Sequence, residues 1–208
     1  MRFKRNEREL SEIKRDLHVL GLTGGIASGK TVAASALRRT GYTVIDADEI
    51  SRELTASGSE NEKVLTKLFP KATVNGALDR KALRRIIATD DGARKTLNAF
   101  THPLITERVK SEVAAATPPI IISAPLLFET GLSSLCDAVV CIVCPKRIRI
   151  ERIMSRDGLT RADAERMIDM QLPDHVRASL ADFCIPSDGD IADFEAETIE
   201  LFTALFDR

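Results

Sequence analysis

The sequence predicts an α/β fold, a doubly wound parallel sheet of five strands flanked by helices. Short apolar runs recur along the chain, helical stretches separate them, and a glycine-rich loop follows the first run. Continuous apolar runs, as opposed to alternating ones, are typical of parallel strands that are covered on both faces. The predicted strands cover residues 19–22, 43–45, 120–122, 138–143 and 183–185.

Length and charge limit the classes of protein that the chain can represent. Its 208 residues, 44% of them hydrophobic, suffice for one domain with a filled core. The formal net charge of -1 provides no basic field for nucleic acid, and no apolar stretch approaches the roughly 20 residues that span a bilayer. We therefore expect a cytoplasmic protein, a monomer or weak homo-oligomer, with neither nucleic acid nor membrane as a partner.

The chain divides into an N-terminal extension, residues 1–16, and a single domain, residues 17–208. The extension mixes basic residues with four acidic ones, which argues against a mitochondrial presequence and favours a solvated, helical segment. Among the four cysteines, Cys141 and Cys144 form a C-x-x-C pair. They lie in the apolar run 138–143 or directly after it, without a second pair, so we interpret them as structural.

A phosphate loop follows the first strand. Residues 24–31 (GGIASGKT) fit the pattern G-x-x-x-x-G-K-[ST], in which backbone N–H groups surround a phosphate at the start of a helix. Lys30 supplies a positive charge, and Thr31 supplies an oxygen for Mg²⁺. The pattern predicts binding of a nucleotide such as ATP by Gly25, Ile26, Ala27, Ser28, Gly29, Lys30, Thr31 and Val32.

The second strand closes with two carboxylates, Asp46 and Asp48. At alternate positions of a strand they would share a face, and a strand running beside the phosphate loop would bring them to the bound phosphates. One of them could then accept a proton from an attacking hydroxyl or hold Mg²⁺ through water. The alternative is that Asp48 only caps a helix that begins at Glu49.

The third strand lacks an Asp directly after its apolar run, where a Walker-B acid usually stands, because Ser123 follows it. The guanine signature N-K-x-D and the switch motif D-x-x-G are also missing. A GTPase is therefore disfavoured, and the acids of the second strand gain importance. This combination favours a small-molecule kinase of the P-loop kinase-like fold.

Two helical segments lie outside the sheet, a substrate-binding insertion at about residues 50–117 and a lid at about residues 145–175. In the lid Arg149, Arg152 and Arg156 share one helix face, from which they could stabilise the charge of phosphoryl transfer. An exposed helix with ordinary ion pairs is an equally good reading. In the insertion, Pro103 is expected to open a helix, and His102 to be structural or to position a substrate.

The motifs together resemble the dephospho-coenzyme A kinase family. Residues 22–31 (LTGGIASGKT) are similar to the family's LTGGIGSGKS, and residues 44–48 (VIDAD) to its second-strand signature. Residues 75–83 (NGALDRKAL) resemble DGxLxRxxL, residues 102–105 (HPLI) resemble HPxI, and residues 125–129 are PLLFE. The resemblance runs from about Leu17 to the C-terminus.

The resemblance implies transfer of the γ-phosphoryl group of ATP to the 3′-hydroxyl of dephospho-coenzyme A, with Mg²⁺ as cofactor. It implies that Asp48 is the catalytic acid that activates the hydroxyl, and that Asp46 supports it, the substrate or the metal. Lys30, Arg152 and Arg156 would neutralise the moving phosphoryl group. The implied substrate contacts are Arg80, His102 and Leu126.

Three residues depart from the family pattern: Ala27 replaces a Gly, Thr31 replaces Ser, and Ser187 stands near a usual Asn. Ala27 restricts the backbone if that position needs a positive φ. Two other functions stay open at this point. One is another P-loop kinase, acting on a nucleoside monophosphate or a small alcohol, and the other is a nucleotide-binding regulatory switch.

Overall fold

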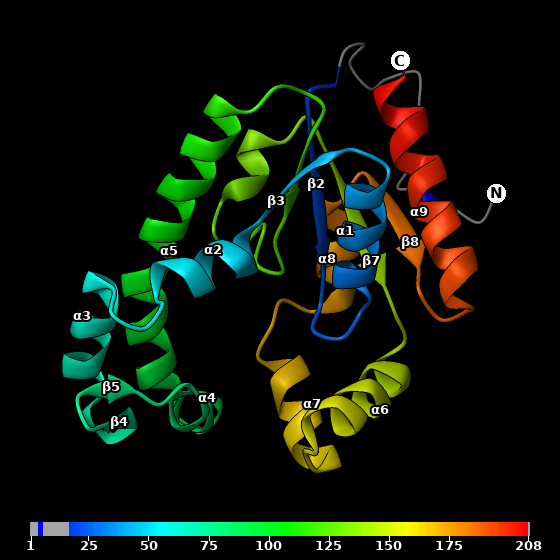
Figure 1. The fold of residues 1–208 in the computed structure, drawn as a ribbon. Helices are drawn as coiled ribbons and strands as arrows, with labels where there is room; N and C mark the ends of the chain where they lie inside the picture. Colours follow the sequence, from blue (N-terminus) through cyan, green and yellow to red (C-terminus); the bar gives the residue numbers. More distant parts are fainter. Residues whose placement is uncertain (1–3, 6–16, 208) are drawn as a thin grey trace. The chain divides into compact units, whose positions relative to one another are not determined.

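The computed structural model describes residues 4–5 and 17–207. The chain forms two compact units, of which the first comprises Met1–Asp46 and Glu112–Arg208 and the second Ala47–Ser111. Figure 1 shows the course of the chain through both. Within the part of the chain described, no helix is long and apolar enough to cross a membrane.

A six-stranded sheet forms the centre of the first unit, in the order β1-β8-β7-β2-β6-β3. Five of these strands are parallel, as the sequence predicts. All but β3 consist mainly of buried apolar residues, because helices cover both faces of the sheet. The five strands are β2 (Val19–Gly24), β3 (Thr43–Asp46), β6 (Ile120–Ser123), β7 (Ala138–Val143) and β8 (Phe183–Pro186).

The sixth strand is β1 (Lys4–Arg5), which pairs antiparallel with the edge strand β8. The prediction of a helical N-terminal extension is wrong for these two residues. They add backbone hydrogen bonds to a sheet edge that would otherwise be open. Residues 1–3 and 6–16 of the predicted extension lie outside the described residues.

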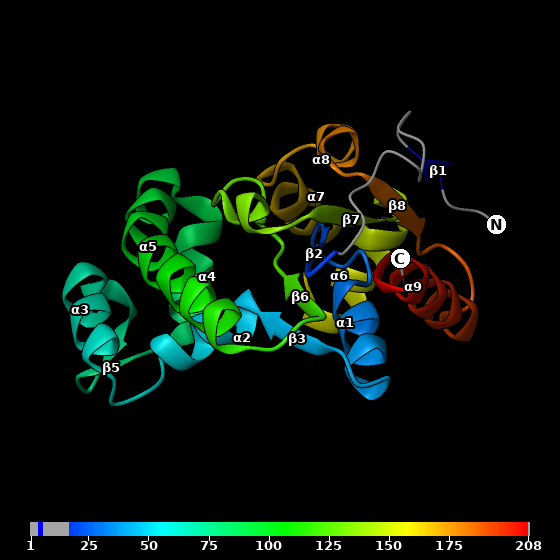
Figure 2. The same cartoon turned by 90° about the horizontal axis from the view of Figure 1, so that it is seen from above.

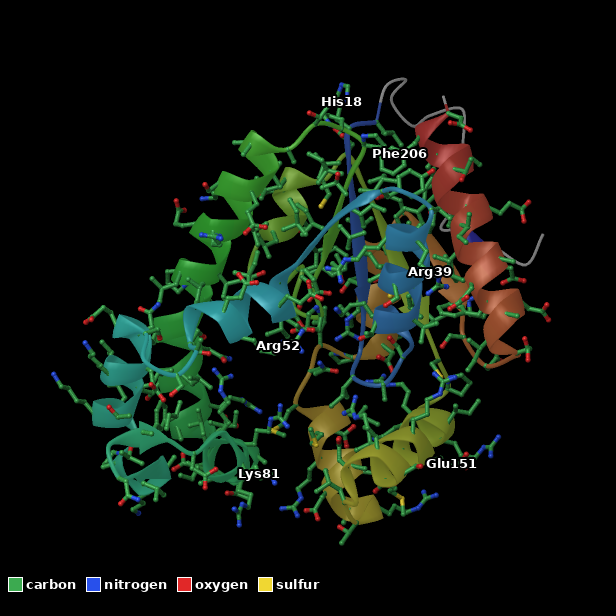
Figure 3. All side chains as sticks on the ribbon, in the orientation of Figure 1. His18, Arg39, Arg52, Lys81, Glu151 and Phe206 are labelled. Carbon is green, nitrogen blue, oxygen red and sulfur yellow. The ribbon has the colours of Figure 1, made fainter. Side chains whose placement is uncertain are left out.

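Helices α1 (Lys30–Arg39) and α9 (Ile191–Phe206) cover one face of the sheet and lie side by side (Figure 2). Their buried side chains join those of β2, β7 and β8 in the main core. Arg39 reaches Glu195 of α9 at 2.7 Å, and Phe206 packs on Tyr42 with 5.3 Å between ring centroids. Arg39 and Phe206 are labelled in Figure 3. The helix that follows the glycine-rich loop therefore packs against the sheet and α9 through the main core.

The remaining elements of the first unit follow β6 and β7. The short 3₁₀ helix η3 and helix α8 lie on the other side of the sheet from α1, and α8 contacts β7. Helices α6 and α7 form a pair with its own apolar cluster, which also includes Ile26 and Ala27 of the glycine-rich loop. The bounds are η3 (Leu132–Leu135), α6 (Lys146–Asp157), α7 (Arg161–Asp169) and α8 (Asp174–Leu180).

The second unit is mainly helical and has a separate core of Leu65, Phe69, Ala72 and Leu83. A two-stranded antiparallel hairpin, which the sequence analysis missed, stands among its helices. The elements are α2 (Ala47–Leu54), α3 (Glu60–Leu68), η2 (Pro70–Ala72), β4 (Thr73–Val74), β5 (Ala77–Leu78), α4 (Arg80–Thr89) and α5 (Asp91–Ala115), whose last turn belongs to the first unit.

Two local predictions for this unit are wrong. Asn75 and Gly76 both have positive φ, 51° and 80°, which gives the two-residue turn of a hairpin where only helix was expected. Pro103 does not open a helix, since α5 begins at Asp91 and continues through it. A proline inside a helix costs one backbone hydrogen bond, which the packing of a 25-residue helix can offset.

Candidate active site

The glycine-rich loop connects β2 to α1, as the sequence predicts. Gly29, with φ of 107°, stands at the N-cap of α1 and offers no side chain to cap the helix. The first N–H groups of the helix are therefore available for an anion, which the positive end of the helix dipole also favours. The turn itself is closed by the N–H of Ser28, which donates to the carbonyl of Gly25 at 3.0 Å.

Ala27 adopts a left-handed backbone conformation with φ of 59°. A Cβ atom in this region is strained by roughly 1–2 kcal/mol, and glycine avoids that cost. The backbone at this position therefore has the positive φ at which replacing the family's Gly by Ala introduces strain. Its methyl group packs on the apolar cluster of α6 and α7.

Lys30, Asp46 and Ser123 form a buried polar triad at the carboxyl ends of the strands. The Lys30 Nζ lies 3.5 Å from Asp46 Oδ2 and donates to Ser123 Oγ at 3.0 Å. The Ser123 hydroxyl donates to the same Asp46 oxygen at 2.8 Å. All three are less than one tenth exposed. The ammonium group is therefore held in place by a carboxylate and a hydroxyl.

The strand order corrects how Asp46 reaches the loop. The second strand is expected to run beside the phosphate loop; Asp46 at its end does reach Lys30, but β6 separates β3 from the loop strand β2. Asp46 is instead the register partner of Ser123, at the end of β6 where a Walker-B acid usually stands. A short serine on the middle strand lets the carboxylate of the outer strand take that place.

Asp48 does not share a strand face with Asp46. The strand ends at Asp46 and helix α2 begins at Ala47, so Asp48 lies in the first turn of that helix, with its side chain exposed. The alternative, that Asp48 caps a helix beginning at Glu49, is also wrong, because the helix begins at Ala47. A carboxylate there is favoured by the helix dipole. Asp46 belongs to the first unit and Asp48 to the second.

Two arginines of α6 contact the glycine-rich loop. Arg152 donates to the carbonyl of Ala27 at 3.2 Å, and to the hydroxyl and carbonyl of Ser187 at 3.2 and 2.8 Å. The Ser187 hydroxyl in turn donates to the carbonyl of Ser28. Arg149 is buried against the carbonyl of Ile26 at 2.7 Å. The arginine spacing indicated a shared face but not that Arg149 would be the buried member.

Arg156, by contrast, lies at the surface. Its side chain is 58% exposed and makes a paired contact with Asp157, at 2.9 and 2.7 Å. This contact raises the pKa of the guanidinium above its usual value. No described hydrogen bond brings Arg156 to the loop, so in this structure it fits the reading of an exposed, ion-paired residue.

The residues expected to contact an acceptor are distributed over both units. In the second unit, Arg80 donates to the carbonyl of Thr55 at 2.5 Å and to its hydroxyl at 3.2 Å, after the end of α2. His102 lies half-buried within α5. Leu126 belongs to the first unit, half-buried in the turn after β6.

Burial limits the reactivity of two of the four cysteines. All four are free thiols. Burial raises the pKa of Cys136 to about 12, and burial also raises the pKa of Cys144. Both thiols are therefore protonated at neutral pH and poor nucleophiles. Among the described residues no group of three His, Cys, Asp or Glu side chains could hold a metal ion.

The residues near the loop nevertheless fit Mg²⁺ bound together with phosphates. Mg²⁺ prefers oxygen ligands and usually takes one or two from the protein, the rest coming from phosphate and water. Thr31 presents an exposed hydroxyl in the first turn of α1, and Asp46 contributes a carboxylate. The buried hydroxyl oxygens of Thr23 and Ser28 have no hydrogen-bond partner among the described residues. These are oxygen donors of the required kind.

A phosphate loop between the first parallel strand and its helix, with a buried carboxylate beside its lysine, defines a P-loop phosphotransferase fold. Solved structures with similar folds include shikimate kinase from Acinetobacter baumannii, with a TM-score of 0.56 at 14% identity over 90% of this chain and 94% of that one. This likeness concerns the fold alone.

The sequence profile of the family described as dephospho-CoA kinase matches residues 18–193. A dephospho-CoA kinase from Moorella thermoacetica is 40% identical over 182 residues, which are 84% of this chain and 86% of the relative. One from Geobacter sulfurreducens is 34% identical over 91% of this chain and 100% of its own. The chain belongs to the dephospho-CoA kinase family.

Solved structures agree with this assignment. A protein from Thermus thermophilus has a TM-score of 0.75 at 31% identity, covering 92% of this chain and 99% of its own. Dephospho-CoA kinase from Campylobacter jejuni has a TM-score of 0.66 at 28% identity, covering 91% and 97%. Family and fold together imply a kinase that uses a nucleotide.

Proposed function

We propose that this protein transfers the γ-phosphoryl group of ATP to the 3′-hydroxyl of dephospho-coenzyme A, yielding coenzyme A and ADP. The observation that carries the proposal is the anchored lysine of the phosphate loop, in a chain that belongs to this family. Lys30 is held by Asp46 and Ser123. A positioned cation stabilises the charge that develops on the transferred group.

The donor half of the site is proposed to consist of the loop and the start of α1. Backbone N–H groups from Gly29 to Thr31 would bind the phosphates of ATP, and the loop contacts of Arg152 would keep a second positive charge at the loop. Mg²⁺ would be held by Thr31 and, through water, by Asp46. When bound, Mg²⁺ would neutralise phosphate charge.

The acceptor half is proposed on the resemblance of its residues to the family. Asp48 would accept the proton of the 3′-hydroxyl, because a carboxylate within hydrogen-bond reach makes that oxygen a better nucleophile. Arg80, His102 and Leu126 would contact or orient dephospho-coenzyme A. Arg80 already donates to carbonyls at and after the end of α2, so its guanidinium is held in one place within its unit.

The role of Asp48 is tested by neutralising it without changing its shape. We expect Asp48→Asn to keep its affinity for ATP and to lose a factor of roughly 10² or more in turnover, as when a general base is removed. An ADP-release assay with dephospho-coenzyme A as acceptor measures turnover, and a calorimetric titration with ATP measures the affinity. Glu49→Gln is the matched control, since it removes the neighbouring carboxylate of the same helical turn. Equal activity of Asp48→Asn and wild type would remove Asp48 from the mechanism.

A further inference from the structure

Arg149 is one of the most deeply buried side chains of the described chain, and all three of its nitrogens are engaged. It is 1% exposed. Its Nε donates to the carbonyl of Ile26 at 2.7 Å, its Nη1 donates to Asp174, and its Nη2 donates to Gln171 Oε1 at 3.4 Å. These contacts leave this guanidinium poorly placed to serve as a phosphate ligand.

The same glutamine completes the hold on Ile26. Gln171 Oε1 accepts the backbone N–H of Ile26 at 2.7 Å. Both backbone polar groups of Ile26 are therefore bonded to side chains that come from α6 and from the segment before α8. Ile26 immediately precedes Ala27, the residue held at positive φ. The contacts thus act on the loop at its strained point.

Gly25 is shaped to this arginine. A Cβ atom at Gly25 would lie 2.4 Å from Nη2 and 2.7 Å from Cζ of Arg149. Glycine, which has no side chain, leaves the space that the guanidinium occupies beside the loop. The second position of the loop is thus determined by a protein side chain as well as by the turn.

The charge of Arg149 is balanced within the first unit. Asp174 bonds Arg149 through one oxygen and Arg177 through the other, at 2.9 Å for Arg177. Arg177 is also 1% exposed and lies 3.9 Å from Glu129. Buried cations are tolerated when carboxylates pair with them, and breaking such a pair is costly. The Arg149 guanidinium is therefore held by the loop carbonyl of Ile26 at its Nε and by Asp174 at its Nη1.

We propose that Arg149, Gln171 and Asp174 form a clamp that holds the phosphate loop in its nucleotide-binding shape before nucleotide arrives. Arg149 is then a positioning residue that acts through the backbone of Ile26. The inference rests on the proposed function only in taking the loop as a nucleotide site. A loop that is ordered in advance binds more tightly, because a smaller fraction of the molecules must rearrange.

The test uses the full chain and ADP, so that no acceptor is needed. We expect Arg149→Met to increase amide hydrogen exchange of residues 24–29 and to weaken ADP binding by about tenfold or more, since the competent loop is less populated. Arg147→Met is the matched control, because Arg147 lies on the same helix with its side chain 73% exposed. Exchange and affinity equal to the control would overturn the clamp.

Arg149→Lys distinguishes positioning from simple charge. Lysine keeps the positive charge, but its compact ammonium group cannot reach the three separate acceptors that the planar guanidinium spans. The clamp predicts that Arg149→Lys resembles Arg149→Met in both measurements. Wild-type exchange and affinity in Arg149→Lys would show that the charge alone matters, and would overturn the clamp.

Gln171→Leu keeps the proposal testable if Arg149 variants fail to fold, because it changes no charge and removes the one oxygen that accepts from both the Ile26 N–H and Arg149 Nη2. It is expected to weaken ADP binding in the same direction with the thermal midpoint held near that of wild type. Unchanged loop exchange in this variant would overturn the clamp. Failure of the wild type to phosphorylate dephospho-coenzyme A would contradict the proposed function, but the comparisons of ADP affinity and of amide hydrogen exchange between variants would stay valid.

Discussion

The carboxylate that contacts Lys30 of the phosphate loop is Asp46 of β3, a strand that is not adjacent to the loop strand β2 in the sheet. The sequence indicates Lys30 through its motif and Asp46 through the strand end. It does not indicate Ser123 as their bridge, because the order of strands in a parallel sheet cannot be read from their order in the chain. The structure shows one carboxylate reaching across β6 to the lysine.

Ala27→Gly tests the strain in the loop. Since Ala27 has φ of 59°, we expect the glycine variant to raise the free energy of unfolding by up to ~1 kcal/mol, less whatever the lost methyl contact contributes. Ala196→Gly, at an exposed position inside α9, is the control and should lower it by ~1 kcal/mol. Urea denaturation measures both. Equal losses in the two variants would show that Ala27 is unstrained.

At the scale of elements, the strands of the sheet could be predicted and several details of the second unit could not. Continuous apolar runs identify buried strands directly. The Asn75-Gly76 turn was a readable hairpin signal that the flanking helical pattern obscured. The passage of α5 through Pro103 could not be read locally, since tertiary packing overrides a helix breaker there.

Glu62 of α3 accepts hydrogen bonds from the turn before its helix and from β5. Its carboxylate accepts the N–H of Gly58 at 2.6 Å and that of Leu78 in β5 at 3.1 Å. The hydrogen bond from Gly58, followed by that from Leu78, lowers the pKa of Glu62 below its usual value of 4.5. Stability from these bonds is fully present above that usual value and is lost as the pH falls through the lowered one.

We therefore expect the stability of the second unit to decrease on acidification below about pH 4.5, and Glu62→Gln to weaken that dependence while lowering stability at neutral pH. Urea denaturation at a series of pH values measures it. Glu60→Gln is the control, because the Glu60 side chain is 87% exposed and bonded only to Lys63 in the described contacts. A parallel loss of stability in wild type and Glu62→Gln would contradict this role.

At the scale of the whole molecule, the two compact units divide the expected site residues between them. The phosphate loop, Lys30 and Asp46 belong to the first unit, while Asp48, Arg80 and His102 belong to the second. The motifs predicted the residues without predicting that the division falls between Asp46 and Ala47. That boundary depends on the strand ending at Asp46 and the helix starting at once, which the acidic VIDAD segment does not reveal.

Separate units predict separate effects of core mutations. Leu83→Ala removes a side chain that is 8% exposed from the core of the second unit and should destabilise that unit by about 2–4 kcal/mol. Affinity for ADP should stay within about twofold, because the residues proposed to bind it lie in the first unit. Leu205→Ala is the matched control, because it removes a side chain from the core of the first unit, where the residues proposed to bind ADP lie. Calorimetric titration with ADP measures the difference, and a large loss of ADP affinity in Leu83→Ala would contradict it.

The most direct test follows the product. Incubated with ATP, Mg²⁺ and dephospho-coenzyme A, the wild-type protein should form a product that is heavier by one phosphate, with one ADP released for each molecule formed. Phosphorus NMR should place the new phosphate as a monoester on the ribose 3′ oxygen. Phosphorylation of AMP or shikimate, with dephospho-coenzyme A left unchanged, would contradict the proposed function.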